Sequence, residues 1–383
     1  MRRFISISRI AGFASLAWIA RSRTIRPFPR TGTGAFARAT SCAICSKRLS
    51  RAAWPKGWSG ADGFAVDASL IAADANKQRS VPSDEWNLEE IKDRACRAAH
   101  EYLATLDDAA FGAASPVTPK FISRSDPAAQ WTGAHKGHAF FAYATNYLVD
   151  TDHGVIVDVE ATRAIRQAEV GAARTMLERT QDRFGLKPDY LTADSAYGSA
   201  ECLAWLVKQK KITPHIPVFD KSTRTDGTFS RADFTFDPER NRYTCPAGKE
   251  LVQFRRTYAT RRTGITAEGT RLYRASKKDC DVCELKERCC PNVVARKIPR
   301  DVHEDARDVA RALASTPEYE AACRRRKKVE MLFAHLKRIL RLGRLRLRGP
   351  YGAKDEFLLA ATAQNLRRLA KLRPVDAPMG IAS

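Results

Sequence analysis

Acidic residues are missing from the first sixty positions of the chain, which hold twelve Lys or Arg and no Asp or Glu. More than half of the net charge of +23 therefore lies in about a sixth of the sequence. Such a segment is typical of a targeting peptide or of a basic DNA-binding arm. It also resembles a segment translated from a shifted frame or a wrong start. These three interpretations of residues 1–60 stay open, and each of them predicts a disordered segment.

Long apolar runs are also missing. No stretch approaches the ~20 residues that a membrane-spanning helix needs, so the sequence predicts no span. The charge of +23 predicts a polyanionic partner, because a basic surface gains affinity by releasing counterions from phosphate backbones. Nucleic acid is the default partner, and an anionic membrane surface is the rival.

A short apolar run that ends in a carboxylate stands near the middle of the sequence. Residues 190–193 can form a buried strand, Asp194 follows it, and a turn at Gly198 leads into a helical pattern over residues 200–207. Ligands of open α/β sheets bind at the carboxyl ends of the strands, so this order predicts that Asp194 lies in a site. The alternative is that Asp194 only caps the following helix.

A second carboxylate interrupts the apolar strand predicted over residues 64–71. Asp67 is costly in such a strand unless it is paired or binds a metal. We prefer it to Asp74, which lies in a polar run, and to Asp126, whose Ser-Asp-Pro context is typical of a turn.

A third carboxylate lies in a basic helix predicted over residues 324–342. The apolar stripe of that helix consists of Val329, Leu332, Phe333, Leu336 and Leu340. Glu330 stands at the edge of the stripe, with Arg326 and Lys337 on the same side. The alternative role of Glu330 is an intrahelical ion pair with Arg326 or Lys327, worth about 0.3–0.5 kcal/mol. Lys337 is either a phosphate contact or part of a solvated basic face.

Two strand-borne aspartates and one helix-borne glutamate are what a two-metal phosphoryl-transfer site requires. Their oxygen atoms suit Mg²⁺ or Mn²⁺. Two such ions can activate the attacking oxygen and stabilise the leaving one. Beyond the helix, Arg and Leu alternate over residues 338–348, which predicts contacts of Arg346 and Arg348 with a phosphate backbone.

The basic segment of residues 220–300 holds five of the ten cysteines of the chain. A complete zinc motif would have two Cys-x2-Cys pairs, but the first half of this segment holds only one cysteine, Cys245. Four thiolates remain available at metal-ligand spacing: Cys245, Cys280, Cys283 and either Cys289 or Cys290. They can hold tetrahedral Zn²⁺ in a zinc-ribbon-like insert, or they can be free thiols of a compact basic insert. Clustered cysteines in a large basic chain fit a reducing compartment.

The remaining pattern from residue 61 alternates strands and helices. A hairpin is predicted for residues 137–150 and 154–160, helices for 88–106, 164–184 and 357–369, a loop for 111–130 and a strand for 212–218. This order predicts an α/β fold with a mixed sheet flanked by helices.

Six passages, in this order, resemble DDE transposases of bacterial insertion sequences, in the subgroup with a cysteine-rich insert before the last glutamate. They are residues 64–67 (FAVD), 149–156 (VDTDHGVI), 193–198 (ADSAYG), 243–248 (YTCPAG), the cysteine spacing of 280–289, and Arg326-x3-Glu330-x6-Lys337 with the later Asn365-Leu366. The resemblance covers about residues 61–372.

The resemblance implies a ribonuclease-H-like fold in which residues 61–219 form the first part, 220–300 the insert, 301–372 the helical completion and 373–383 a tail. It implies Asp67, Asp194 and Glu330 as the catalytic triad, with Mg²⁺ or Mn²⁺ as cofactor. The reaction would be metal-dependent endonuclease cleavage at the ends of the element, followed by attack of the freed 3′-hydroxyl on target DNA. The implied partners are DNA and further copies of the chain, in the nucleoid of the bacterial cytoplasm and not at a membrane.

The sequence departs from this family in two places. Cys323 stands where the extended signature of the family has a tyrosine, three residues before Arg326. The first sixty residues do not look like the helical DNA-binding domain that usually precedes the first aspartate. Two rival functions therefore stay open: a nuclease of the same fold without strand transfer, and a non-catalytic, zinc-containing DNA-binding protein.

Overall fold

The computed structural model describes residues 62–87, 96–111, 119–133, 137–220, 222, 224–253 and 264–372. The interpretations of residues 1–60, the first half of the helix predicted at 88–106 and the predicted tail lie outside these ranges. No helix within them is long and apolar enough to span a membrane.

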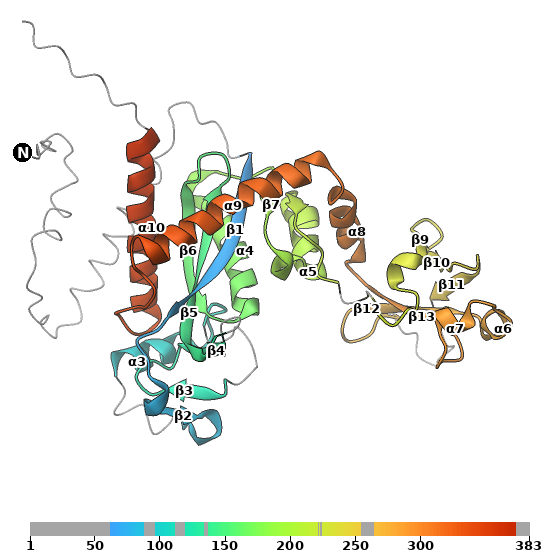
Figure 1. Cartoon of the computed structure of the whole chain (residues 1–383), viewed down its shortest axis with the longest axis horizontal. Coiled ribbons are helices and arrows are strands. Elements are labelled where there is room, and N and C mark those ends of the chain that lie inside the picture. Colours follow the sequence, from blue (N-terminus) through green and yellow to red (C-terminus); the bar gives the residue numbers. More distant parts are fainter. Residues whose placement is uncertain are drawn as a thin grey trace, which may run out of the picture. The chain divides into compact units, whose positions relative to one another are not determined.

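A six-stranded mixed sheet organises the larger part of the described chain (Figure 1). Its strands are β1 (Gly63–Ala72), β4 (Gln130–Gly133), β5 (Ala139–Asp150), β6 (Ile156–Arg163), β7 (Tyr190–Thr192) and β8 (Thr213–His215). β1 is antiparallel to β5 and parallel to β7, and β7 is parallel to β8. On the side away from β1, the first residues of β5 pair with β4 and the following residues pair with β6. β1 is thus a central strand of the sheet.

The two faces of the sheet carry separate apolar cores because side chains alternate along each strand. On β1, Phe64 and Val66 belong to the first core, whereas Ala65 and Ile71 belong to the second. The first core includes side chains of α4 (Arg166–Phe184), α5 (Ala200–Ala204) and α8 (Glu304–Leu313). The second includes side chains of α9 (Pro317–Arg338) and α10 (Pro350–Leu372).

Shorter elements complete this part of the chain. β2 (Ser80–Pro82) and β3 (Phe121–Ser123) form a separate two-stranded sheet, α3 (Arg97–Ala104) packs against α10, and a π-helical turn (Trp205–Lys210) follows α5. The 3-10 turns of this part are η1 (Lys77–Arg79), η2 (Ser83–Glu85) and η4 (Ser195–Tyr197).

A second sheet is built from the segment between β8 and α8. It is antiparallel in the order β13-β12-β11-β10-β9 and has a small core of its own. Its strands are β9 (Thr235–Asp237), β10 (Arg242–Thr244), β11 (Glu250–Gln253), β12 (Thr270–Ala275) and β13 (Lys297–Asp301), preceded by the turn η6 (Arg231–Asp233). Two short helices, α6 (Lys277–Asp281) and α7 (Lys286–Cys289), lie between β12 and β13.

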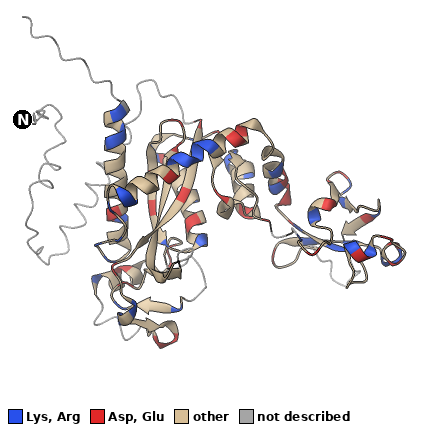
Figure 2. Ribbon diagram, viewed as in Figure 1, with Lys and Arg blue, Asp and Glu red and all other residues tan. Residues whose placement is uncertain are grey.

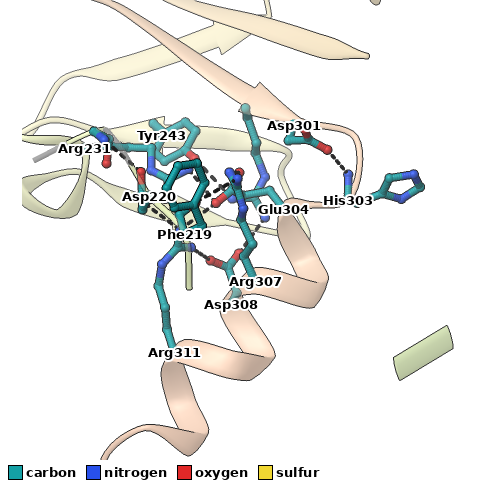
Figure 3. Close-up of polar contacts among 12 residues, drawn as sticks. Phe219, Asp220, Arg231, Tyr243, Asp301, His303, Glu304, Arg307, Asp308 and Arg311 are labelled. Carbon is teal, nitrogen blue, oxygen red and sulfur yellow. Dashed lines mark hydrogen bonds and ion pairs between the residues drawn. The ribbon is translucent and has the colours of Figure 1, made fainter. Parts of the chain in front are cut away.

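A network of ion pairs ties the first residues of this segment to α8 (Figure 3). Glu304 is 1% exposed and its carboxylate pairs with Arg231, Arg307 and Arg311. Asp220 pairs with Arg231 and Arg311. Burial raises the pKa of Glu304, but the three surrounding guanidinium groups outweigh it and leave that pKa below its ordinary value. Glu304 is therefore an ionised, buried anchor.

Most elements predicted from periodicity are present, with shifted ends. The strand at 64–71, the hairpin and the helix at 164–184 are confirmed as β1, β5 with β6, and α4. The helix predicted at 324–342 begins earlier, because Pro317 follows the capping Thr316, and it ends at Arg338. The prediction of a loop over 111–130 was wrong in part, since this range contains β3 and the first residue of β4.

Candidate active site

Asp67 and Asp194 come from two neighbouring parallel strands: Asp67 lies within β1, and Asp194 lies two residues past the end of β7. The last paired residues of β1 and β7 are Ala65 and Thr192, and each aspartate lies two residues beyond its strand's member of that pair. Because β1 and β7 run in the same direction, this register brings the two carboxylates to one level of the sheet. The electrostatic effect of Asp194 on the pKa of Asp67 agrees with this proximity.

Asp67 lies on the face of β1 that α9 covers, opposite Tyr147 of β5. Its side chain is 19% exposed, and its carboxylate accepts a hydrogen bond of 2.8 Å from the backbone N–H of Ala68. Burial raises the pKa of Asp67 from its ordinary 3.8 to about 6, and the carboxylates of Asp194 and Glu330 contribute to the rise. The strand therefore holds a carboxylate whose burial the nearby guanidinium of Arg326 offsets only in part.

The passage around Asp194 folds into η4, a 3-10 turn that Asp194 caps. Its carboxylate accepts the N–H of Ala196 at 2.8 Å, so Asp194 caps this turn, whereas the helix that follows, α5, is capped by Ser199. Tyr197 is buried, and Gly198 has no room for a side chain, since a Cβ there would lie 2.0 Å from the carbonyl oxygen of Pro217. The small residues of this passage thus let the turn pack closely, while one oxygen of the Asp194 carboxylate accepts the capping hydrogen bond.

Glu330 reaches the same site from α9. The helix is fixed on the sheet by Phe333, whose ring stacks on Tyr147 with 4.8 Å between centroids. The guanidinium of Arg326 bridges the site, 3.3 Å from the carboxylate of Asp67 and 3.1 Å from that of Glu330. The predicted intrahelical ion pair is therefore present, and the same arginine also joins the helix to β1.

Basic residues of α9 also hold the turn between β5 and β6. The ammonium group of Lys328 donates to the carbonyl oxygens of Thr151 and Asp152, and Arg325 donates to the hydroxyl of Tyr190 at 2.8 Å. From α10, the side-chain amide of Asn365 bonds both the N–H and the carbonyl of Ile156, at 2.9 and 2.8 Å. These contacts give the passages at 149–156 and 365–366 a structural role: they dock α9 and α10 on the sheet.

Glu169, in the first turn of α4, is a fourth carboxylate that the sequence interpretation missed. Burial raises its pKa from 4.5 to about 7, followed by the effects of Asp194 and Asp67. Within the described ranges the carboxylate of Glu169 makes no hydrogen bond or ion pair. The hydroxyl of Tyr197, whose pKa is raised by burial and then by these three acids, is buried without a hydrogen-bond partner. An acid in a first helical turn is ordinary, so the sequence carried no signal for it.

The predicted DNA-binding residues lie on α9 and on the segment after it. Lys337 is seven residues after Glu330 on the same helix, and partial burial lowers its pKa. Arg346 is exposed. Arg348 instead pairs with Asp74 at 2.9 Å, which connects this segment to the end of β1. Basic residues recur along α9 in Figure 2.

The four cysteines predicted as ligands lie around one pocket of the second sheet. Cys245, Cys280, Cys283 and Cys289 line it together with Cys290. As the side chains stand, no group of three or more His, Cys, Asp or Glu residues in the described ranges could hold a metal ion, either here or at Asp67. At Asp67 the bridging guanidinium of Arg326 fills the place between two of the carboxylates.

Comparison with known proteins agrees with this arrangement. Residues 58–366 match the family described as the transposase DDE domain. The chain belongs to the DDE transposases. No curated protein and no solved structure matches it. The match spans Asp67, Asp194 and Glu330, and it also spans the second sheet.

Proposed function

We propose that this DDE transposase cuts DNA at the ends of an insertion sequence and joins the freed 3′-hydroxyl to target DNA. The observation that carries the proposal is the joint position of the three acids. Asp67 within β1 and Asp194 just past β7 stand at one level of two paired parallel strands, and Arg326 spans Asp67 and Glu330. The electrostatic effects of Asp194 and Glu330 on Asp67 support the same grouping.

We also propose that the sheet is ribonuclease-H-like. The strand order β6-β5-β1-β7-β8, with three antiparallel strands followed by two that run parallel to β1, supports this assignment. The helices on both faces and the placement of Asp67 in β1 and Asp194 just after β7 are consistent with it. The second sheet then enters as an insert between β8 and α8.

The oxygen ligands fit Mg²⁺ or Mn²⁺. Asp67 of β1 and Asp194 after β7 would hold such ions from the sheet, and Glu330 would complete the set from α9. When bound, the metal would activate the attacking oxygen and stabilise charge on the leaving one. Ionised Asp67 lacks enough positive charge around it, which is the property expected of a carboxylate that receives a cation.

The basic residues would bind and orient the DNA. Arg326, released from Asp67 and Glu330, would be free to contact a phosphate next to the scissile bond. Lys337 and Arg346, further along, would contact the backbone of the flanking DNA. We propose that the chain acts as a homo-oligomer on DNA, within the bacterial cytoplasm.

The test uses duplex DNA that carries the flanking sequence of the gene, together with a target plasmid and Mg²⁺ or Mn²⁺. We expect nicked ends and joined product from the wild-type chain, and a loss of both of at least about 10³-fold in Asp194→Asn and Glu330→Gln. Glu320→Gln is the matched control, because this α9 acid is exposed and, among the described residues, its carboxylate pairs only with Arg324. Cleavage without joined product would favour the nuclease, and binding without cleavage would favour the non-catalytic protein.

A further inference from the structure

Five thiols converge on one pocket of the second sheet, outside the site of the three acids. They come from three separate pieces of chain: Cys245 follows β10, Cys280 lies in α6 with Cys283 just after it, and Cys289 ends α7 with Cys290 next to it. All five are free thiols. Cys245 lies 35 residues before Cys280, so its meeting with the other four is a property of the fold and not of the sequence pattern alone.

Two of the sulfurs already accept backbone hydrogen bonds. The N–H of Lys249 donates to Sγ of Cys245 at 3.3 Å, in a turn closed by the N–H of Gly248 on the carbonyl of Cys245. Gly248 takes a positive φ of 74°, which a glycine adopts without strain. A backbone N–H of Arg296 bonds to Cys280. N–H groups directed at sulfur stabilise a thiolate more than a thiol.

The thiols also lie against one another. Cys290 hydrogen-bonds with Cys280 and with Cys289, and Cys283 acts electrostatically on Cys280. Burial raises the pKa of Cys280, and it raises that of Cys289 to about 12. Cys280, Cys289 and Cys290 are therefore packed against one another in a small pocket.

We propose that this pocket binds one Zn²⁺ through Cys245, Cys280, Cys283 and one thiol of the Cys289 and Cys290 pair. Cys280 and Cys283 supply the Cys-x2-Cys grip, and the tight turn at Cys245 supplies the opposite side of a tetrahedron. Because the sulfurs do not yet surround a single point closely enough, binding turns them inward and releases their protons.

The ion would stabilise the second sheet and would not take part in DNA cleavage. The core of this sheet is small, and the cysteines are a large part of it. One ion would join the β10–β11 turn, α6 and α7 around that core, in the way that structural zinc compensates for too little buried apolar surface. This inference does not depend on the proposed transposition chemistry.

The test measures metal in the full-length chain purified under reducing conditions without added metal. We expect about one zinc per chain by plasma mass spectrometry, and at least about a tenfold loss in Cys280→Ser and in the double variant Cys289→Ser with Cys290→Ser. The matched control is Cys96→Ser, an exposed cysteine outside the segment, which should keep its zinc.

A second measurement guards against a variant that fails to fold. Wild-type chain stripped of metal and titrated with Co²⁺ should develop thiolate-to-cobalt absorption that saturates at one ion per chain and is displaced by Zn²⁺. Absence of zinc with no cobalt signal, a bound iron in place of zinc, or full zinc content in folded Cys280→Ser would each overturn the inference.

Discussion

The clearest quantitative consequence of the site concerns Asp67. Its pKa is raised from 3.8 to about 6, mainly by burial, even though Arg326 lies 3.3 Å away and lowers it. One pH unit corresponds to about 1.4 kcal/mol, so the folded chain destabilises the ionised carboxylate by up to about 3 kcal/mol. We therefore expect Asp67→Asn to abolish Mg²⁺-dependent cleavage and yet to stabilise the metal-free protein by about 1–3 kcal/mol at pH 8.

The pH dependence has a definite sign. Unfolded chain loses the Asp67 proton near pH 3.8, whereas folded chain keeps it until about pH 6. The folded state binds more protons in that window, so wild-type stability falls as the pH rises from about 4 to about 6 and stays lower above it. The Asp67→Asn variant escapes this loss. Its advantage over wild type should therefore be largest at pH 8 and much smaller at pH 4.

The assay is urea unfolding with EDTA at pH 8 and pH 4, followed by circular dichroism. Excess Mg²⁺ should stabilise the wild-type chain but not the Asp67→Asn variant. Asp74→Asn is the matched control, because Asp74 pairs with Arg344 and Arg348 and its loss should reduce stability. A variant that is less stable than wild type at pH 8, or equally shifted at both pH values, would refute the argument from burial.

Three further substitutions test other parts of the structure. Gly198→Ala should lower the melting temperature by several degrees, because its Cβ meets the backbone at 2.0 Å, whereas Gly343→Ala, with open space around it, should change it little. Glu304→Gln should lower the free energy of unfolding, measured with urea, by about 3 kcal/mol. In the wild-type chain, this carboxylate stabilises the fold above about pH 4.5, and that stabilisation should be lost as the pH falls further. Arg326→Ala removes the cation that lowers the Asp67 pKa, so the acid limb of the cleavage rate should shift to higher pH between pH 5.5 and 8.5; an unshifted limb would contradict this assignment.

The acids and their elements were predictable from sequence because each one breaks a local pattern. Asp67 interrupts an apolar strand, Asp194 ends one, and Glu330 is a lone acid in a basic helix. The partners of the cations were not predictable. Arg326 spans β1 and α9, and Arg348 meets Asp74, since such contacts depend on how distant segments pack.

Other features left no local signal at all. Glu169 occupies an ordinary position in a first helical turn and is unusual only because it is buried near Asp194 and Asp67. The five short strands of the second sheet lie in polar, basic sequence, where alternation over three to six residues is too brief to read. The observed starts of α9 and α10 differ from the predicted ones because the two helices begin at Pro317 and Pro350 and not at the first residue of the apolar stripe.

The second sheet is built from the segment between β8 and α8, which lies between Asp194 and Glu330 in the sequence. The spatial separation of Asp194 and Glu330 is set by the seating of α9 on β1 and β5, not by the length of polypeptide that joins them. The ion pairs of Glu304 hold the beginning of this segment to α8, where the segment ends. The segment that forms the second sheet could therefore be lengthened, shortened or exchanged, in evolution or by protein engineering, provided that the ion pairs of Glu304 are retained.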